Sequence, residues 1–190
     1  DRIYKGRVVF RGDQVRDENG FYAVFSEQSA SASQMAAAKF VDAIARYAQA
    51  AYTQVEIADV PHLLNRHNKE TQAQTWISLP KNRRPAWRDT IQDPVCLLKR
   101  NLYGHKLAGL IWEKHCHKHV LAAGFTKISG WECLFVHKKM QVFLSIYVDD
   151  FRMAGKASNL PKMWEALRTG LDLDPPTKSV DNTYLGCRQH

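Results

Sequence analysis

Two adjacent carboxylates, Asp149 and Asp150, follow an apolar, β-branched and aromatic run that begins at Phe143. A second short apolar stretch then leads to Gly155. Successive strand residues face opposite sides of a sheet, so an Asp pair inside a strand would bury one carboxylate at a large cost. The pattern predicts a β-hairpin with both carboxylates at its tip, where they can reach solvent or a metal ion. The alternative is an ordinary turn, which Asp favours through local hydrogen bonds.

The composition is that of a globular chain with a basic surface. The 190 residues are 45% hydrophobic, which is enough for one sizeable core. Lys and Arg number 27 against 19 acidic residues, a net charge of +8. This balance favours an anionic partner such as nucleic acid or a nucleotide. The four cysteines are widely spaced and form no CxxC pair, so we expect reduced thiols and an intracellular location.

No membrane or targeting segment is predicted. Every apolar run is shorter than the about 18 residues that a membrane helix needs, and the first residues lack the apolar part of a signal peptide. A strand-like stretch begins at once, and the chain stops soon after Tyr184. We therefore expect a fragment of a longer protein, without a membrane partner.

Periodicity and turn residues predict the main elements. Apolar residues spaced three and four apart predict helices over residues 29–48, 108–123 and 156–169, with Gly124 and Gly170 ending the last two. Short apolar runs predict strands over residues 5–12, 76–80, 95–98 and 134–137.

Two basic segments could hold phosphate groups. Lys5, Arg7 and Arg11 stand on the first predicted strand, where they could bind phosphate or could be solvated charges on a sheet edge. A loop over residues 81–93 combines basic residues with Trp87. It could follow a nucleic-acid backbone while stacking a base, or it could be a plain exposed loop.

A run of His115, Cys116, His117 and His119 resembles a metal-binding motif at first sight. His115 and His119 share a helix face, but no acidic residue or further Cys/His pair stands at a metalloprotease-type spacing. A solvated basic face is the better interpretation of this run.

The order of these motifs resembles the reverse transcriptase domain of copia-type LTR retrotransposon polyproteins, over nearly the whole chain. Residues 5–12 are similar to its opening "KARLVARG" strand, and residues 93–106, continuing to Trp112, are similar to its "V.KL.KSLYGLKQAPRAW" segment. Gly124 and Phe125 match "LGF", residues 147–150 match the signature polymerase hairpin, and residues 184–186 match "YFLG".

The resemblance implies an α+β fold, a right-hand polymerase palm with partial fingers and an antiparallel sheet packed on helices. Residues 1–190 would be a single reverse transcriptase fragment without thumb, RNase H or integrase. The implied activity is RNA-directed DNA polymerisation, in which two Mg²⁺ (or Mn²⁺) ions assist nucleotidyl transfer. The implied partners are an RNA/DNA template-primer and a dNTP, and the implied location is the cytoplasm, in a particle of the retrotransposon, or the nucleus.

The resemblance also assigns roles to single residues. Asp149 would chelate the metal ions with Asp150 assisting, and Tyr52 would form the floor of the sugar pocket. Lys5, Arg7 and Arg11 would hold the triphosphate. The positions that would contact nucleic acid are Tyr147, Arg83, Arg84 and Arg88.

Two departures from the family pattern argue against activity. Counting back from Ala51 to the family's earlier palm Asp reaches Tyr47, and the nearby carboxylates, Asp42, Glu56 and Asp59, are not expected in register. The strand that should carry this Asp is predicted to be missing. Leu107 also replaces a Gln that contacts the nucleotide. We therefore expect an impaired or inactive polymerase; the alternatives are a catalytically silent nucleic-acid-binding remnant of the same fold and a degenerate, unstable fragment.

Overall fold

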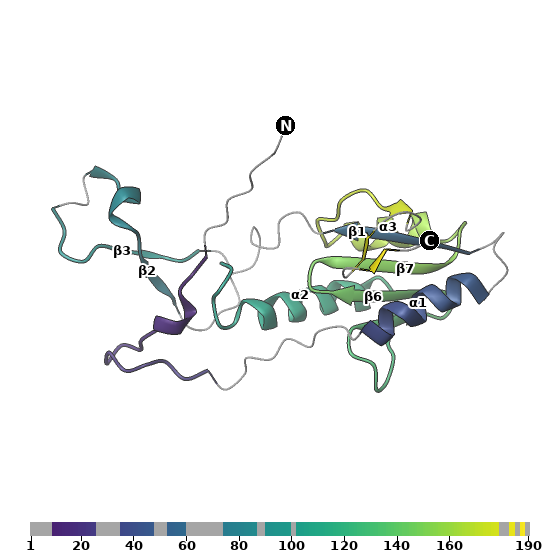
Figure 1. Ribbon diagram of the computed structural model, residues 1–190, viewed down its shortest axis with the longest axis horizontal. Helices are drawn as coiled ribbons and strands as arrows, with labels where there is room; N and C mark the ends of the chain where they lie inside the picture. Colours follow the sequence, from purple (N-terminus) through teal and green to yellow (C-terminus); the bar gives the residue numbers. More distant parts are fainter. Residues whose placement is uncertain are drawn as a thin grey trace.

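The computed structural model describes residues 9–25, 35–47, 53–59, 74–86, 90–99, 102–178, 183–184 and 187–188 (Figure 1). The helices are α1 (Met35–Tyr47), α2 (Ala108–Ala122) and α3 (Leu160–Arg168), with short 3-10 helices η1 (Gly12–Gln14) and η2 (Lys81–Arg83). The strands are β1 (Thr53–Asp59), β2 (Trp76–Ser78), β3 (Val95–Leu97), β4 (Thr126–Lys127), β5 (Leu134–His137), β6 (Val142–Tyr147), β7 (Asp150–Lys156), β8 (Thr177–Lys178), β9 (Thr183–Tyr184) and β10 (Cys187–Arg188).

A six-stranded antiparallel sheet forms the centre of the fold, in the order β4-β5-β6-β7-β1-β8. The β6–β7 hairpin lies in the middle, and β1 pairs with β7 along seven residues. Two-residue periodicity in β6 explains why both faces of this hairpin are covered. Leu144 and Ile146 are buried toward one face, while Phe143 packs toward the other.

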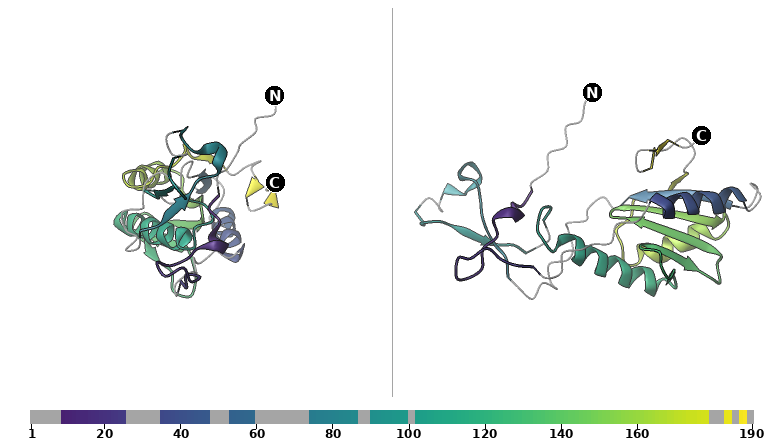
Figure 2. Two further views of the ribbon diagram at one scale, coloured as in Figure 1. Left: turned by 90° about the vertical axis from the view of Figure 1, so that its left-hand side faces the viewer. Right: turned by 60° about the horizontal axis from the view of Figure 1, so that its bottom comes forward.

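Helices cover both faces of this sheet, as the end-on view in Figure 2 shows. Residues of α2 and α3, including Val120 and Trp164, form one core with the alternate residues of β6 and β7. Residues of α1 pack on the opposite face, where the Phe40 ring lies 5.4 Å from the Phe143 ring. A buried ion pair between Asp42 of α1 and Arg152 of β7 adds to this second layer.

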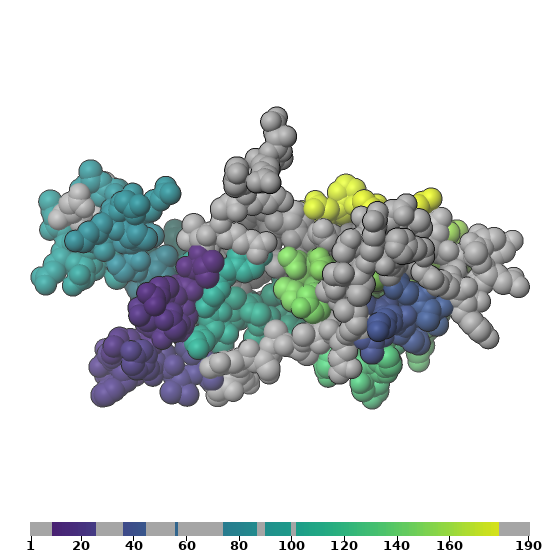
Figure 3. Space-filling model, viewed as in Figure 1, coloured from purple at the N-terminus to yellow at the C-terminus, as the bar shows by residue number. Residues whose placement is uncertain are grey.

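A smaller part of the chain lies beyond the N-terminal end of α2. It contains residues 9–25 and the antiparallel β2–β3 pair. Phe10 N–H donates to the Tyr103 carbonyl at 2.6 Å, and a side chain at either Gly12 or Gly104 would collide with the facing backbone. Figure 3 shows this contact between the purple segment and the start of α2. The described parts of two segments that the sequence analysis singled out are therefore in contact, through residues 10–12 and 103–104.

Most predicted elements are confirmed, including the helix at residues 108–123 and the strand at residues 134–137. The strand predicted over residues 5–12 is wrong where the structure describes it, since η1 begins at Gly12. Helix α3 begins at Leu160 rather than residue 156, because Lys156 is held in β7 by its pairing with Thr53. The prediction of a missing strand is also wrong, because β1 follows α1 and joins the sheet.

Candidate functional site

The acidic residues lie at the tip of the β6–β7 hairpin, as predicted. Tyr147 pairs with Asp150, so Val148 and Asp149 form a two-residue loop. Val148 has a positive φ of 53°, which is typical of the first central residue in type I′ and II′ hairpin turns. A β-branched residue rarely adopts this conformation, so the turn is strained.

Helix α2 supports this turn directly. The Trp112 indole Nε1–H donates to the Val148 carbonyl at 2.6 Å. Trp112 lies in the second turn of α2, whose later residues are packed into the core. The strained turn is thus tied to a packed helix, which fixes the position of the neighbouring carboxylates.

Asp149 and Asp150 are both half-buried. Asp149 occupies the second loop position and Asp150 is the first residue of β7. Carboxylate oxygens in this state retain access to solvent, and they are the ligands that Mg²⁺ prefers. The tip can therefore offer two adjacent hard ligands to a divalent ion.

The strand beside the hairpin brings a third acidic residue to its tip. The register of β1 and β7 places Asp59 directly opposite Asp150. The prediction that no earlier carboxylate stands in register is therefore wrong. It relied on Ala51 as a marker, whereas β1 begins after that residue and runs antiparallel to β7, so its last residue reaches the tip.

The other two nearby carboxylates have structural partners. Asp42 forms the buried ion pair with Arg152, and Glu56 accepts a hydrogen bond from the Trp164 indole at 2.7 Å. Glu56 pairs with Met153, three residues along β7 from Asp150. Asp42 and Glu56 therefore each join a helix to the sheet.

The remaining predicted site residues either lie in separate elements or fall outside the residues that the structure describes. Arg11 is exposed and forms an ion pair with Asp13 at 3.0 Å, and Arg83 is exposed in η2. Arg84 donates to the Leu79 carbonyl at 2.8 Å, which holds the chain after β2. Tyr147 is half-buried at the end of β6. Lys5, Arg7, Tyr52 and Arg88 lie outside the described residues.

The residue after Tyr52 is described and bears on its predicted role. Thr53 pairs with Lys156, at the end of β7 away from Asp150. The beginning of β1 and the acidic tip are therefore at opposite ends of the same pair of strands.

Sequence comparison relates part of the chain to transposon proteins. The truncated transposon Ty1-A Gag-Pol polyprotein of Saccharomyces cerevisiae is 32% identical over 73 residues, which are 38% of this chain and 6% of that protein. Part of this chain is similar to transposon Gag-Pol polyproteins. The transposon Ty1-DR5 Gag-Pol polyprotein of the same organism shows the same identity over 73 residues, 38% of this chain and 4% of its own length.

The similarity covers only a small part of these Gag-Pol polyproteins, which are much longer than this chain. No family model matches the sequence, and no solved structure matches the fold. Within the described residues, every helix is too short or too polar to cross a membrane.

Proposed function

We propose that this chain is the palm and partial fingers of an RNA-directed DNA polymerase from a copia-type retrotransposon polyprotein. The observation that carries the proposal is the acidic hairpin tip, with Tyr147, Val148, Asp149 and Asp150 in the order of the polymerase signature. The similarity to transposon Gag-Pol polyproteins supports the same origin.

The proposed reaction is attack of a primer 3′ hydroxyl on the α-phosphate of a dNTP, with pyrophosphate leaving. Two divalent ions about 3.5–4 Å apart would stabilise the attacking and leaving oxygens. Asp149 and Asp150 would supply hard oxygen ligands for Mg²⁺ or Mn²⁺.

Asp59 completes this proposal. Its register opposite Asp150 supports a role as the third acidic ligand, the one that counting from Ala51 did not locate in the sequence. The main reason for expecting an inactive polymerase is thereby removed, although Leu107 still departs from the family pattern. We therefore propose that the chain retains nucleotidyl transfer.

Primer extension on poly-rA/oligo-dT with Mg²⁺ or Mn²⁺ tests this proposal. We expect extension by the unaltered chain and its loss, by a factor of about 100 or more, in Asp149→Asn and in Asp59→Asn, because a metal ligand is removed. Asp172→Asn, at an exposed position before β8, is the matched control and should extend normally. Extension that survives Asp149→Asn would overturn the proposal.

A second candidate is nucleic-acid binding without catalysis, which the net charge of +8 favours. It predicts that the unaltered chain binds a template-primer but does not extend it. Affinity should then fall steeply as salt rises, because phosphate contacts release counterions. Binding that is independent of salt would contradict this candidate.

A further inference from the structure

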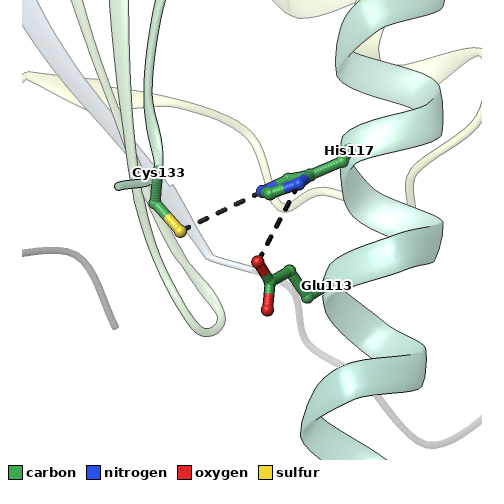
Figure 4. A group of neighbouring side chains, drawn as sticks. All are labelled: Glu113, His117 and Cys133. Carbon is green, nitrogen blue, oxygen red and sulfur yellow. Dashed lines mark hydrogen bonds and ion pairs between the residues drawn. The ribbon is translucent and has the colours of Figure 1, made fainter. Parts of the chain in front are cut away.

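Three side chains of different chemistry meet between α2 and the sheet, away from the acidic hairpin (Figure 4). Glu113 and His117 stand one turn apart on α2, and Cys133 lies just before β5. One ligand atom from each of them lies within 4.8 Å of the others. Cys133 Sγ is 4.0 Å from His117 Nε2, and His117 Nδ1 is 4.0 Å from a Glu113 carboxylate oxygen.

The backbone holds Cys133 in this place. Its φ is 53°, and its carbonyl accepts a hydrogen bond from the Ile146 N–H at 3.0 Å. This bond joins the residue to the end of β6, close to the turn of the β6–β7 hairpin. The thiol is thus presented by a turn that is hydrogen-bonded to the sheet, and it faces a helix whose own residues are packed in the core.

The burial of the three residues suits an ion that enters from solvent and is then shielded. Cys133 is 5% exposed, whereas the side chains of Glu113 and His117 are 18% and 21% exposed. Lys127 is the nearby cation that opposes a positive ion here, and it is ion-paired with Glu132 at 2.9 Å. Its charge is therefore largely offset.

We propose that Glu113, His117 and Cys133 form a zinc-binding site. Thiolate, imidazole and carboxylate are the three ligand types that proteins use for Zn²⁺, and the thiolate disfavours Mg²⁺. His117 would bind through one ring nitrogen, and the three ligand atoms need to close in around the ion, because Zn²⁺ takes its ligands at about 2.0–2.3 Å. Water fills the fourth tetrahedral position, and the Cys133 thiol releases its proton to solvent on binding.

The site differs from the metal motif considered in the sequence. Of the run from His115 to His119, only His117 takes part, with Glu113 one turn before it and Cys133 from another element. An ion here would join α2 to the end of β6, beside the residue that supports the hairpin turn, since Glu113 follows Trp112. The expected effect of the ion is to tie these two elements together, and this effect does not depend on polymerase activity.

Titration of the purified, EDTA-treated full chain with Co²⁺ and then Zn²⁺ tests this inference. We expect a near-ultraviolet thiolate-to-cobalt absorption band that saturates at about one ion per chain, because Co²⁺ bound to carboxylates alone gives no such band, and displacement of this Co²⁺ by Zn²⁺ but not by excess Mg²⁺. Zn²⁺ should also raise the thermal midpoint, because it binds only the folded state.

Three variants separate this site from other thiols. Cys133→Ser should remove the absorption band, and Glu113→Gln should weaken binding by about tenfold or more. Cys96→Ser, which alters a half-buried thiol on β3, is the control and should keep both the absorption band and the affinity for the ion. If Cys133→Ser does not fold, as judged by circular dichroism, the ion affinity of Glu113→Gln still tests the proposed site. Absence of the band in the unaltered chain, or its retention in Cys133→Ser, would overturn the inference, as would unchanged affinity in Glu113→Gln.

Discussion

Val148 combines a strained backbone with a functional position. Its φ of 53° is costly for a β-branched residue, and the next two residues are the carboxylates of the proposed metal site. Such strain persists only where the surroundings enforce it. The surroundings here include the Trp112 hydrogen bond and the Tyr147–Asp150 pair.

Replacing Val148 by glycine should relieve this strain. Val148→Gly is expected to raise the free energy of unfolding by about 1 kcal/mol, because the relief exceeds the entropy cost of glycine. Val95→Gly is the matched control, since both valines are 47% exposed. Val95 lies in β3, so its replacement should lower stability. Urea unfolding of both variants measures the difference; a loss of stability in both would contradict the strain.

At the level of elements, α1 is attached to the sheet by a charged contact as well as by apolar packing. Arg152 is 1% exposed and forms its ion pair with Asp42 across the α1–β7 interface. A buried ion pair adds little compared with apolar residues, but removing one partner leaves an uncompensated charge in the core.

Asp42→Ala should therefore destabilise the fold strongly. We expect a loss of about 3 kcal/mol or more in the free energy of unfolding, measured by urea titration. The double variant Asp42→Leu with Arg152→Met should recover most of it, because no buried charge remains. Asp13→Ala is the control, since its ion pair with Arg11 is exposed and solvent screens it. A loss in Asp42→Ala no larger than in this control would contradict the account.

Periodicity in the sequence predicted where helices and strands lie better than it predicted which strands pair with one another. The apolar spacing that forms α2 and the two-residue alternation of β6 are local features, so they can be read from the sequence. The strand partner of β7 is not local. Asp59 and Asp150 are opposite one another only because β1 inserts between β7 and β8, and counting residues from Ala51 could not show that.

The same limit applies to the proposed zinc site. Glu113 and His117 share a helix face, which their spacing indicates. Cys133 joins them only through the turn that precedes β5, so no spacing rule links it to α2. The sequence analysis considered His115 and His119 and interpreted the run as a solvated basic face, so it identified neither the Glu113–His117 pair nor Cys133 as ligands.

At the level of the whole molecule, His105 joins the smaller part of the chain to the start of α2. It is 7% exposed, and its Nδ1 accepts a hydrogen bond from the Leu107 N–H at 3.2 Å. Its Nε2 lies 3.2 Å from the Thr75 hydroxyl, just before β2. The Phe10 ring lies 5.4 Å away and belongs to the N-terminal segment. Three segments distant in sequence therefore meet at one imidazole.

This imidazole should make the junction sensitive to acid. Burial lowers the pKa of His105 below its ordinary value of 6.5, so the folded state favours the neutral ring. Protonation would also place a proton on Nδ1, against the Leu107 N–H. The stabilising effect is complete above pH 6.5, the unfolded value, and is lost as pH falls through the lowered pKa of the folded state.

Urea unfolding between about pH 7.5 and about pH 5 measures this effect, since histidine titrates in that range. We expect the free energy of unfolding to fall with pH in the unaltered chain and to fall less in His105→Asn, which keeps a polar side chain without a titrating ring. EDTA in every sample removes any contribution from bound zinc. If His105→Asn shows the same pH dependence as the unaltered chain, the acid sensitivity arises elsewhere, and His105 acts only through packing and hydrogen bonds.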